Sequence, residues 1–138
     1  MNGYTHRCLL LAAALALNAQ STKLEFEVAA VQALGMRLFA PEAPAAAVTA
    51  VLPPEGVDSG AIVKGLRSKF AIIVTDGQGE MKGSLFRIAH IGFFDYMDTI
   101  AVIGALEQVA VALNLPLPNL AFGTGVIAAQ KVFVERTK

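Results

Sequence analysis

An arginine in the middle of an apolar strand is the residue with the clearest chemical potential in this sequence. Arg87 lies in the stretch EMKGSLFRIAHIG, between Phe86 and Ile88. A guanidinium offers a planar fork of N–H donors that matches a carboxylate in two parallel hydrogen bonds. The position of Arg87 in the sequence leaves two interpretations open. In the first, Arg87 binds a carboxylate ligand. In the second, it lies on an edge strand and extends into solvent or towards a neighbouring glutamate.

Two glycine-rich stretches look like nucleotide-binding loops, but local structure explains them better. In DGQGEMKG the glycines miss the G-x-G-x-x-G spacing by one position and lead into a strand, and no glycine-lysine-serine/threonine follows. We therefore predict a hairpin turn there. Gly123, Gly125 and Ala128 do fit G-x-G-x-x-A, yet no clear strand precedes them and no second βα unit with a ribose-binding acid follows. We interpret that stretch as the entrance of a helix.

The remaining polar residues predict neither a metal site nor a catalytic nucleophile. His6, Cys8 and His90 are too few and too scattered to hold a metal ion. A single strand histidine such as His90 is most often a hydrogen-bonded structural residue. Since no serine has a recognisable histidine and acid partner, we assign no catalytic, metal-binding or cofactor-binding residue in this chain.

The composition predicts apolar surface that is hidden against something else. The 138 residues carry no formal net charge, and 55% are hydrophobic but only 16% charged, with a mean hydropathy of +0.58. Ordinary domains contain roughly a quarter charged residues. Nucleic acid is excluded as the expected partner, because no basic face or stripe is present. Such a chain either packs against a partner or crosses a membrane.

One apolar segment near the N-terminus bears on the membrane question. Cys8–Leu17 is too short for a span of ~20 residues, so we predict no membrane segment. Its flanks resemble a secretory signal, with His6 and Arg7 before it and Ala19 after it; a buried helix explains the same residues. The single cysteine excludes an internal disulfide and favours a reducing, cytoplasmic location.

Hydrophobic periodicity and turn residues predict an α+β fold. A T-x-x-E capping box at Thr22–Glu25 begins a helix that ends at Gly35, and Asp58 or Ser59 begins a second helix. The predicted strands are 36–40, 47–52, 70–75 and 84–91, and two further helices cover 95–113 and 126–136. The order α-β-β-α-β-β-α-α predicts a small antiparallel sheet of about four strands with helices packed on one face.

The opposite face of that sheet is predicted to be apolar as well. Arg87 shares it with Leu85, Ala89 and Ile91 by strand alternation. Helices of this chain can cover only one side. We therefore expect a partner on the other face, towards which Arg87 points.

A longer run resembles a known family. GVDSGAIVKGLRSKFAIIVTDGQGEMKGSLFRIAHIGFFDYMDTIAVIGALEQVAVAL is similar to the C-terminal small domain of class V aminotransferases, of the alanine–glyoxylate and serine–glyoxylate type. Its marks are the turn Pro54–Asp58, the glycine-rich hairpin, the run Arg87–Gly92 at a signature arginine-isoleucine-glycine-histidine-methionine-glycine, and Ala105-Leu106-Glu107. Ala89 and Ile91 depart from the signature, which has glycine and methionine there.

The resemblance implies a function and a missing part. In that family the signature arginine binds the α-carboxylate of an amino-acid or oxo-acid substrate, and here it is Arg87. The family's enzymes are homodimers that use pyridoxal phosphate, bound through a lysine of the large domain. No lysine of this chain has that context, so we expect no cofactor on this chain alone and no transamination without the large domain.

The resemblance implies that residues 21–138 form the aminotransferase small domain, and it leaves the first twenty residues unexplained. From their apolar run we expect residues 1–20 to form a separate helix, a linker or a signal-like segment. The missing large domain or a second chain would cover the bare sheet face. Two alternatives stay open: a stand-alone α+β module that binds a protein through that face, and a secreted protein cut after Ala19.

Overall fold

The computed structural model describes residues 24–92 and 95–138 of the chain. The predicted N-terminal segment (residues 1–20), with His6, Cys8 and the possible cleavage point at Ala19, lies outside these residues, as does Thr22 of the predicted capping box. No helix in the described ranges is long and apolar enough to cross a membrane.

Four short strands form one antiparallel sheet, as the sequence predicted. Their order across the sheet is β1-β2-β4-β3. The strands are β1 (Arg37–Leu38), β2 (Val48–Leu52), β3 (Thr75–Asp76) and β4 (Phe86–Ala89). Because the two longer strands β2 and β4 pair in the centre, β4 is an inner strand.

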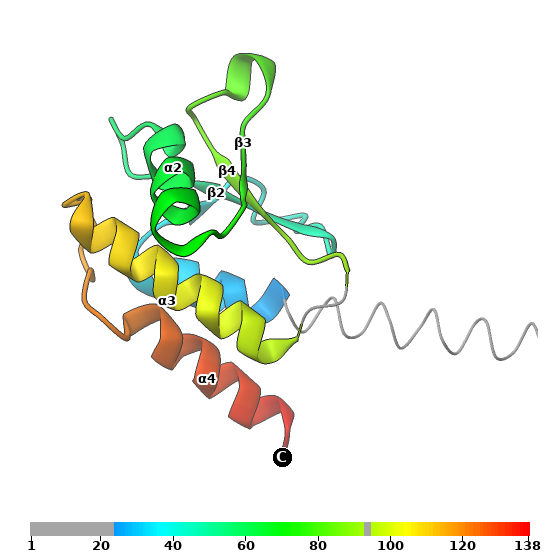
Figure 1. The fold of residues 1–138 in the computed structure, drawn as a ribbon. Helices are drawn as coiled ribbons and strands as arrows, with labels where there is room; N and C mark the ends of the chain where they lie inside the picture. Colours follow the sequence, from blue (N-terminus) through cyan, green and yellow to red (C-terminus); the bar gives the residue numbers. More distant parts are fainter. Residues whose placement is uncertain (1–23, 93–94) are drawn as a thin grey trace, which may run out of the picture.

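Helices cover one face of this sheet, which confirms the predicted α+β architecture. The helix over residues 24–34 comes first, followed by α2 (Ser59–Phe70), the single 3-10 turn η1 (Gly79–Met81), α3 (Tyr96–Ala112) and α4 (Thr124–Arg136). Figure 1 shows α2 and α3 next to the sheet and α4 on the side of α3 away from it. The molecule therefore has a sheet layer, a helix layer and an outer helix.

The core lies between the sheet and the first helix layer. Val51 and Phe86 from the sheet meet Ile62 and Leu66 of α2 and Leu106 of α3, and all five are at most 1% exposed. Burying an aliphatic or aromatic side chain contributes about 1.5–3 kcal/mol, so this layer carries most of the stability of the fold. The predicted periodicity of α2 is confirmed.

The third predicted strand is shorter than expected. Residues 70–75 were predicted as a strand because they are apolar and β-branched, but α2 continues to Phe70. Ala71 then adopts a left-handed conformation (φ 55°), and Ile72 donates its backbone N–H to Leu66. Ala71 itself donates its N–H to Arg67, which is the bond of a left-handed helix end, so the residues after the helix satisfy its last carbonyls. Residues 71–74 are used to leave the helix, and β3 keeps only two residues.

The hairpin prediction for DGQGEMKG is confirmed. The stretch connects antiparallel strands β3 and β4 through η1, and Gly77 donates its N–H to Leu85 at 2.9 Å. A Cβ on Gly77 would lie 1.9 Å from the backbone oxygen of Met81. Glycine is therefore required by the close backbone approach within the turn, and no phosphate is needed to explain it.

The second glycine stretch is the entrance of α4, as predicted. The carboxylate of Glu107, buried in α3, accepts the backbone N–H groups of Gly123 (2.7 Å), Gly125 (2.6 Å) and Val126 (3.0 Å). The N-terminus of a helix attracts anions because its first N–H groups lack partners within the helix. Here the chain's own carboxylate fills that position, which leaves no place for a dinucleotide phosphate.

Candidate functional site

Arg87 lies in the middle of the sheet. In the register of the sheet it pairs with Ala50 of β2 on one side and with Thr75 of β3 on the other. The interpretation that placed Arg87 on an edge strand is therefore wrong. Phe86 and Ile88 face the helices and are buried, so Arg87 belongs to the opposite, outer face.

The guanidinium of Arg87 has a hydrogen-bond partner but no carboxylate partner. Its Nη2 donates to the backbone oxygen of Asp76 at 3.0 Å, and its Nε is buried without a hydrogen bond among the described residues. The ion pairs in the described part of the chain are Glu25 with Arg136 and Glu27 with His90. A half-buried cation thus remains uncompensated by any described acid.

The outer face around Arg87 carries exposed apolar side chains, as the sequence predicted, but Leu85, which was expected on that face as well, is buried (6% exposed). Phe39, Ile73 and Ile91 are 51%, 77% and 66% exposed. Phe39 lies next to Ala50, the residue opposite Arg87, to which it donates its N–H. Ile73 and Ile91 are two positions from Thr75 and Ala89, which face outwards, so by strand alternation they lie on the same outer face. A charged fork surrounded by exposed apolar side chains is typical of a surface that another body covers.

Asp76 holds the hairpin beside Arg87. One oxygen of its carboxylate accepts the hydroxyl of Ser59 at 2.5 Å and the N–H groups of Gly77 at 2.9 Å and Gly83 at 3.3 Å. These bonds, above all that from Ser59, hold the pKa of Asp76 below its ordinary value of 3.8. Asp76 is therefore an ionised anchor between β3, the hairpin and the start of α2.

The same strand carries a second polar group on its inner face. His90 is fully buried, with its Nε2 2.6 Å from the hydroxyl of Thr49 and 3.4 Å from the carboxylate of Glu27. The prediction that His90 is a hydrogen-bonded structural residue is confirmed. The three residues cannot act on a ligand, because all three are at most 2% exposed. They join the helix over residues 24–34 to β2 and β4.

Burial changes the titration of this cluster. Desolvation raises the pKa of Glu27 to about 8 from its ordinary 4.5, and the hydrogen bond with Thr49 only partly opposes it. The sequence alone did not predict a buried polar cluster that contains Glu27 and Thr49. A signal existed for Glu27, which precedes Val31 and Leu34 by four and seven residues and so lies on the buried stripe of its helix.

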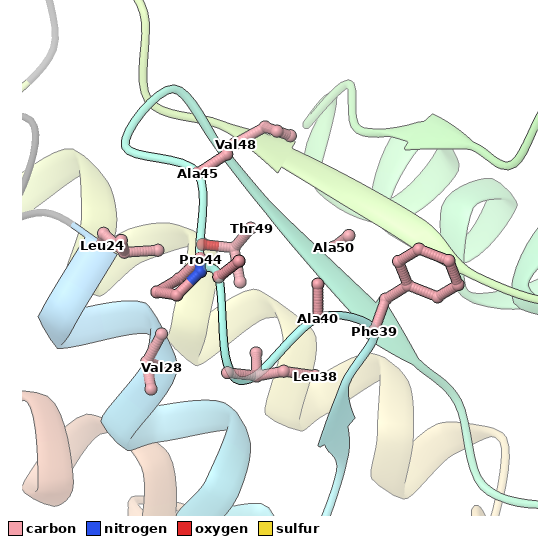
Figure 2. Close-up of a pocket in the computed structure, with 11 residues that line it drawn as sticks. Leu24, Val28, Leu38, Phe39, Ala40, Pro44, Ala45, Val48, Thr49 and Ala50 are labelled. Carbon is pink, nitrogen blue, oxygen red and sulfur yellow. The ribbon is translucent and has the colours of Figure 1, made fainter.

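An apolar pocket of about 170 Å³ lies between the first helix and the segment that leads into β2. Figure 2 shows Leu24 and Val28 on the helix side and Pro44 and Thr49 among the residues across from them. Arg87 does not line this pocket. The pocket shares Phe39 and Ala50 with the outer face but does not include the guanidinium.

The lysines of the described residues bear on pyridoxal phosphate, the cofactor implied by the resemblance. A lysine that forms a Schiff base must be sheltered from water so that its amine loses its proton. In residues 24–92 and 95–138 every lysine is exposed: Lys64, Lys69, Lys82, Lys131 and Lys138. The same ranges contain no cluster of histidine, cysteine and acidic residues that could hold a metal ion.

Comparisons with known proteins agree with this geometry. No protein-family model matches the chain. A serine–glyoxylate aminotransferase of Hyphomicrobium methylovorum is 36% identical over 118 residues, which cover 83% of this chain and 28% of that protein. The crystal structure of pyridoxamine–pyruvate aminotransferase from Mesorhizobium loti superposes with a TM-score of 0.77 and 28% identity, over 86% of this chain and 30% of that one.

Homologues and structural neighbours of this chain are class V aminotransferases. Its four-stranded antiparallel sheet and its helices match the small domain of these aminotransferases. The chain spans little more than a quarter of the length of the curated relatives it matches, which is consistent with a C-terminal small domain.

One relative of this chain carries a different name. The small subunit of a soluble hydrogenase from a Synechococcus strain is 36% identical over 104 residues, covering 75% of this chain and 27% of that protein. The stretch that it shares with this chain has a similar length to those shared with the aminotransferases. The name describes that protein and does not alter the family.

Proposed function

We propose that this chain is the C-terminal small domain of a pyridoxal-phosphate-dependent class V aminotransferase of the alanine– or serine–glyoxylate type, and that Arg87 binds the carboxylate of its amino-acid or oxo-acid substrate. The domain comprises residues 21–138, with residues 1–20 as a separate N-terminal segment, and the complete enzyme is a cytoplasmic homodimer.

The observation that carries the proposal is the uncompensated guanidinium on the outer face. An arginine that is half buried and has no acid partner among the described residues retains its attraction for an anion. A carboxylate matches the fork in charge and in geometry, and excluding water around it would strengthen the contact. The apolar rim of Phe39, Ile73 and Ile91 suits a covering domain that excludes that water.

The division of labour between the two domains follows from the same residues. Pyridoxal phosphate supplies an electron sink for amino transfer when it is bound in the complete enzyme. This chain contributes binding and orientation of the substrate through Arg87. As the resemblance implies, we assign the Schiff-base lysine to the large domain and expect no transamination by this chain alone. The exposure of every lysine in residues 24–92 and 95–138 supports this assignment.

Two other functions are weaker candidates. A protein-interaction module would use the same exposed apolar face, but it would pair Arg87 with an acidic residue of the partner and would bind no small carboxylate. A hydrogenase role is suggested by the name of one relative. Iron–sulfur centres need several cysteine thiolates, whereas this chain has the single cysteine Cys8.

A carboxylate titration tests the role of Arg87. Pyruvate is added to isotope-labelled protein while the side-chain nitrogen signals of Arg87 are followed by NMR. We expect a saturable shift, and about tenfold weaker binding in Arg87→Lys, which keeps the charge but loses the fork. Arg37→Lys, an exposed strand arginine, is the matched control and should change nothing. Equal binding by Arg87→Lys and the wild type would reject the carboxylate role.

Borohydride trapping with pyridoxal phosphate tests the second half of the proposal. After reduction and peptide mass mapping, we expect negligible or scattered labelling of the lysines. A single stoichiometric adduct on one lysine would contradict it, because that result would reveal a self-sufficient cofactor site in this chain.

A further inference from the structure

Arg87 and Asp76 are joined in a way that the carboxylate role of Arg87 does not itself require. Asp76 uses its backbone oxygen to accept Nη2 of Arg87 at 3.0 Å, and its side chain to accept Ser59, Gly77 and Gly83. One residue therefore links the guanidinium on the outer face to a network on the helix side of the sheet.

The register shows why this carbonyl is available. Gly77 donates its N–H to Leu85, so these two residues form a hydrogen-bonded pair of the antiparallel ladder. Hydrogen-bonded and non-hydrogen-bonded pairs alternate along such a ladder, so the next pair, Asp76 with Phe86, exchanges no ladder hydrogen bonds. The N–H and C=O of Asp76 then point away from β4, to the free edge of the sheet. The carbonyl of Asp76 therefore has no partner within the sheet, and it accepts the hydrogen bond from Arg87 instead.

The sheet alone holds that carbonyl weakly. β3 consists of Thr75 and Asp76 only and is an edge strand, so few ladder bonds restrain it. What restrains it is the carboxylate of Asp76, which closes the hairpin and ties it to α2. Without these bonds, the peptide of Asp76 is free to turn and its oxygen can leave the guanidinium.

The three donors to Asp76 are themselves fixed. Ser59 is fully buried at the start of α2, and its backbone N–H bonds to the oxygen of Gly83 at 3.0 Å. Gly77 is buried against the backbone of Met81, where no side chain fits. The carboxylate of Asp76 is therefore held in place by donors that are themselves fixed.

We propose that Asp76 is a positioning residue for Arg87: its carboxylate, held by Ser59 and two backbone amides, fixes the main-chain oxygen that orients the guanidinium. The inference rests on the proposed function, since the oriented fork is the one that would receive the substrate carboxylate. One N–H of Nη2 is committed to Asp76, and the guanidinium is thereby held in one plane while its remaining donors stay available.

The test measures the motion of the guanidinium directly, without a ligand. In isotope-labelled protein, NMR gives the rate of rotation about the Cζ–Nε bond of Arg87 and the rate at which its Nε–H exchanges with water. We expect both rates to rise about tenfold in Asp76→Ala, because the backbone oxygen of residue 76 loses the bonds that hold it in place and its hydrogen bond with Nη2 of Arg87 is weakened. Asp76→Asn keeps an acceptor oxygen and should restore most of the restraint.

Two further variants keep the test sharp. Asp58→Ala is the matched control, since Asp58 caps α2 through Gly60 and has no bond to Arg87. It should weaken the helix and leave the motion of Arg87 unchanged. Ser59→Ala removes one donor to Asp76 and leaves Asp76 in place, so it answers the question if Asp76→Ala does not fold. It should free Arg87 to a smaller extent.

The outcomes separate the two proposals. A rise in the motion of Arg87 together with roughly five- to tenfold weaker pyruvate binding in Asp76→Ala supports both. A rise in motion in a protein whose wild type ignores pyruvate supports the positioning role and rejects the carboxylate role. Unchanged motion in Asp76→Ala and Ser59→Ala, or an equal rise in Asp58→Ala, overturns the positioning role.

Discussion

Two basic residues, Arg87 in β4 and His90 directly after it, have opposite environments in this fold. His90 faces the helices, is fully buried, and has Thr49 and Glu27 against one ring nitrogen. Arg87 faces outwards, is half buried, and has a backbone oxygen as its described partner. The side chains around His90 enclose it in the core, whereas the charge of Arg87 remains available to a ligand or partner. The two residues are therefore distinguished by what surrounds them: His90 has side-chain partners in the core, as a structural residue does, and Arg87 lacks an acidic partner among the described residues, as a binding residue does.

The largest expected contrast is in stability. His90→Ala leaves Glu27 buried without its partner and opens a cavity, so we expect a loss of about 3–5 kcal/mol in the free energy of unfolding. Arg87→Met removes a group that the core does not need and should change it by less than about 1 kcal/mol. Urea unfolding of both variants measures the contrast. Equal losses would mean that Arg87 is as structural as His90.

The second expected effect is a pH dependence that belongs to the inner face. The folded protein binds the proton of Glu27 with a pKa of about 8 and the unfolded chain with 4.5. Stability is therefore highest below the unfolded pKa and falls as the pH rises through this window, by on the order of 2–4 kcal/mol. Urea unfolding from pH 4.5 to 8 measures the slope.

Glu27→Gln is the control for this slope, because the amide resembles the protonated acid and does not titrate. The variant should show a flatter profile and gain stability relative to the wild type at the alkaline end. A profile as steep as that of the wild type would assign the pH dependence to another group, and His90, which faces Glu27, would be the first to examine.

A smaller effect separates two threonines. Thr49→Val removes the hydroxyl that bonds to His90 and should cost about 1–2 kcal/mol. Thr75→Val makes the same change on the exposed outer face opposite Arg87, where a β-branched side chain is kept and we expect a change within about 0.5 kcal/mol. Thermal unfolding compares them; similar losses would argue against a special role for the inner cluster.

The smallest effect concerns Ala89, which stands where the family signature has glycine. Ala89 is exposed on the outer face opposite Val48. Ala89→Gly should lower stability by about 0.5–1 kcal/mol, since glycine weakens a strand. Pyruvate affinity, measured by the same titration, should stay the same. A clear gain in affinity would show that the methyl group of Ala89 hinders the fork of Arg87.

The fold was largely predictable because its signals are local. Asp58 and Asp95 cap the helices they precede, Gly35 ends the first helix, and apolar periodicity marks the buried faces. The third strand was overestimated because β-branched residues fit either a strand or the exit from a helix. Only the left-handed backbone at Ala71, which a sequence does not display, decides between the two.

The site was predictable only in part. Arg87 stood out as a cation in an apolar strand, but Asp76 contributes through a backbone oxygen, which every residue possesses and no sequence pattern marks. Glu27 and Glu107 each lie on an otherwise buried helix stripe, so their burial could have been expected. Their partners could not, because His90 and Gly125 come from other segments of the chain.

The carboxylate of Glu107 has a consequence for folding cooperativity. The first amides of a helix ordinarily exchange their hydrogens with solvent quickly, but those of Gly125 and Val126 are bonded to a side chain at the centre of α3. Opening the start of α4 would therefore leave the buried oxygens of Glu107 without hydrogen-bond donors. We expect α3 and α4 to open together, so that the C-terminal third of the chain unfolds as a unit.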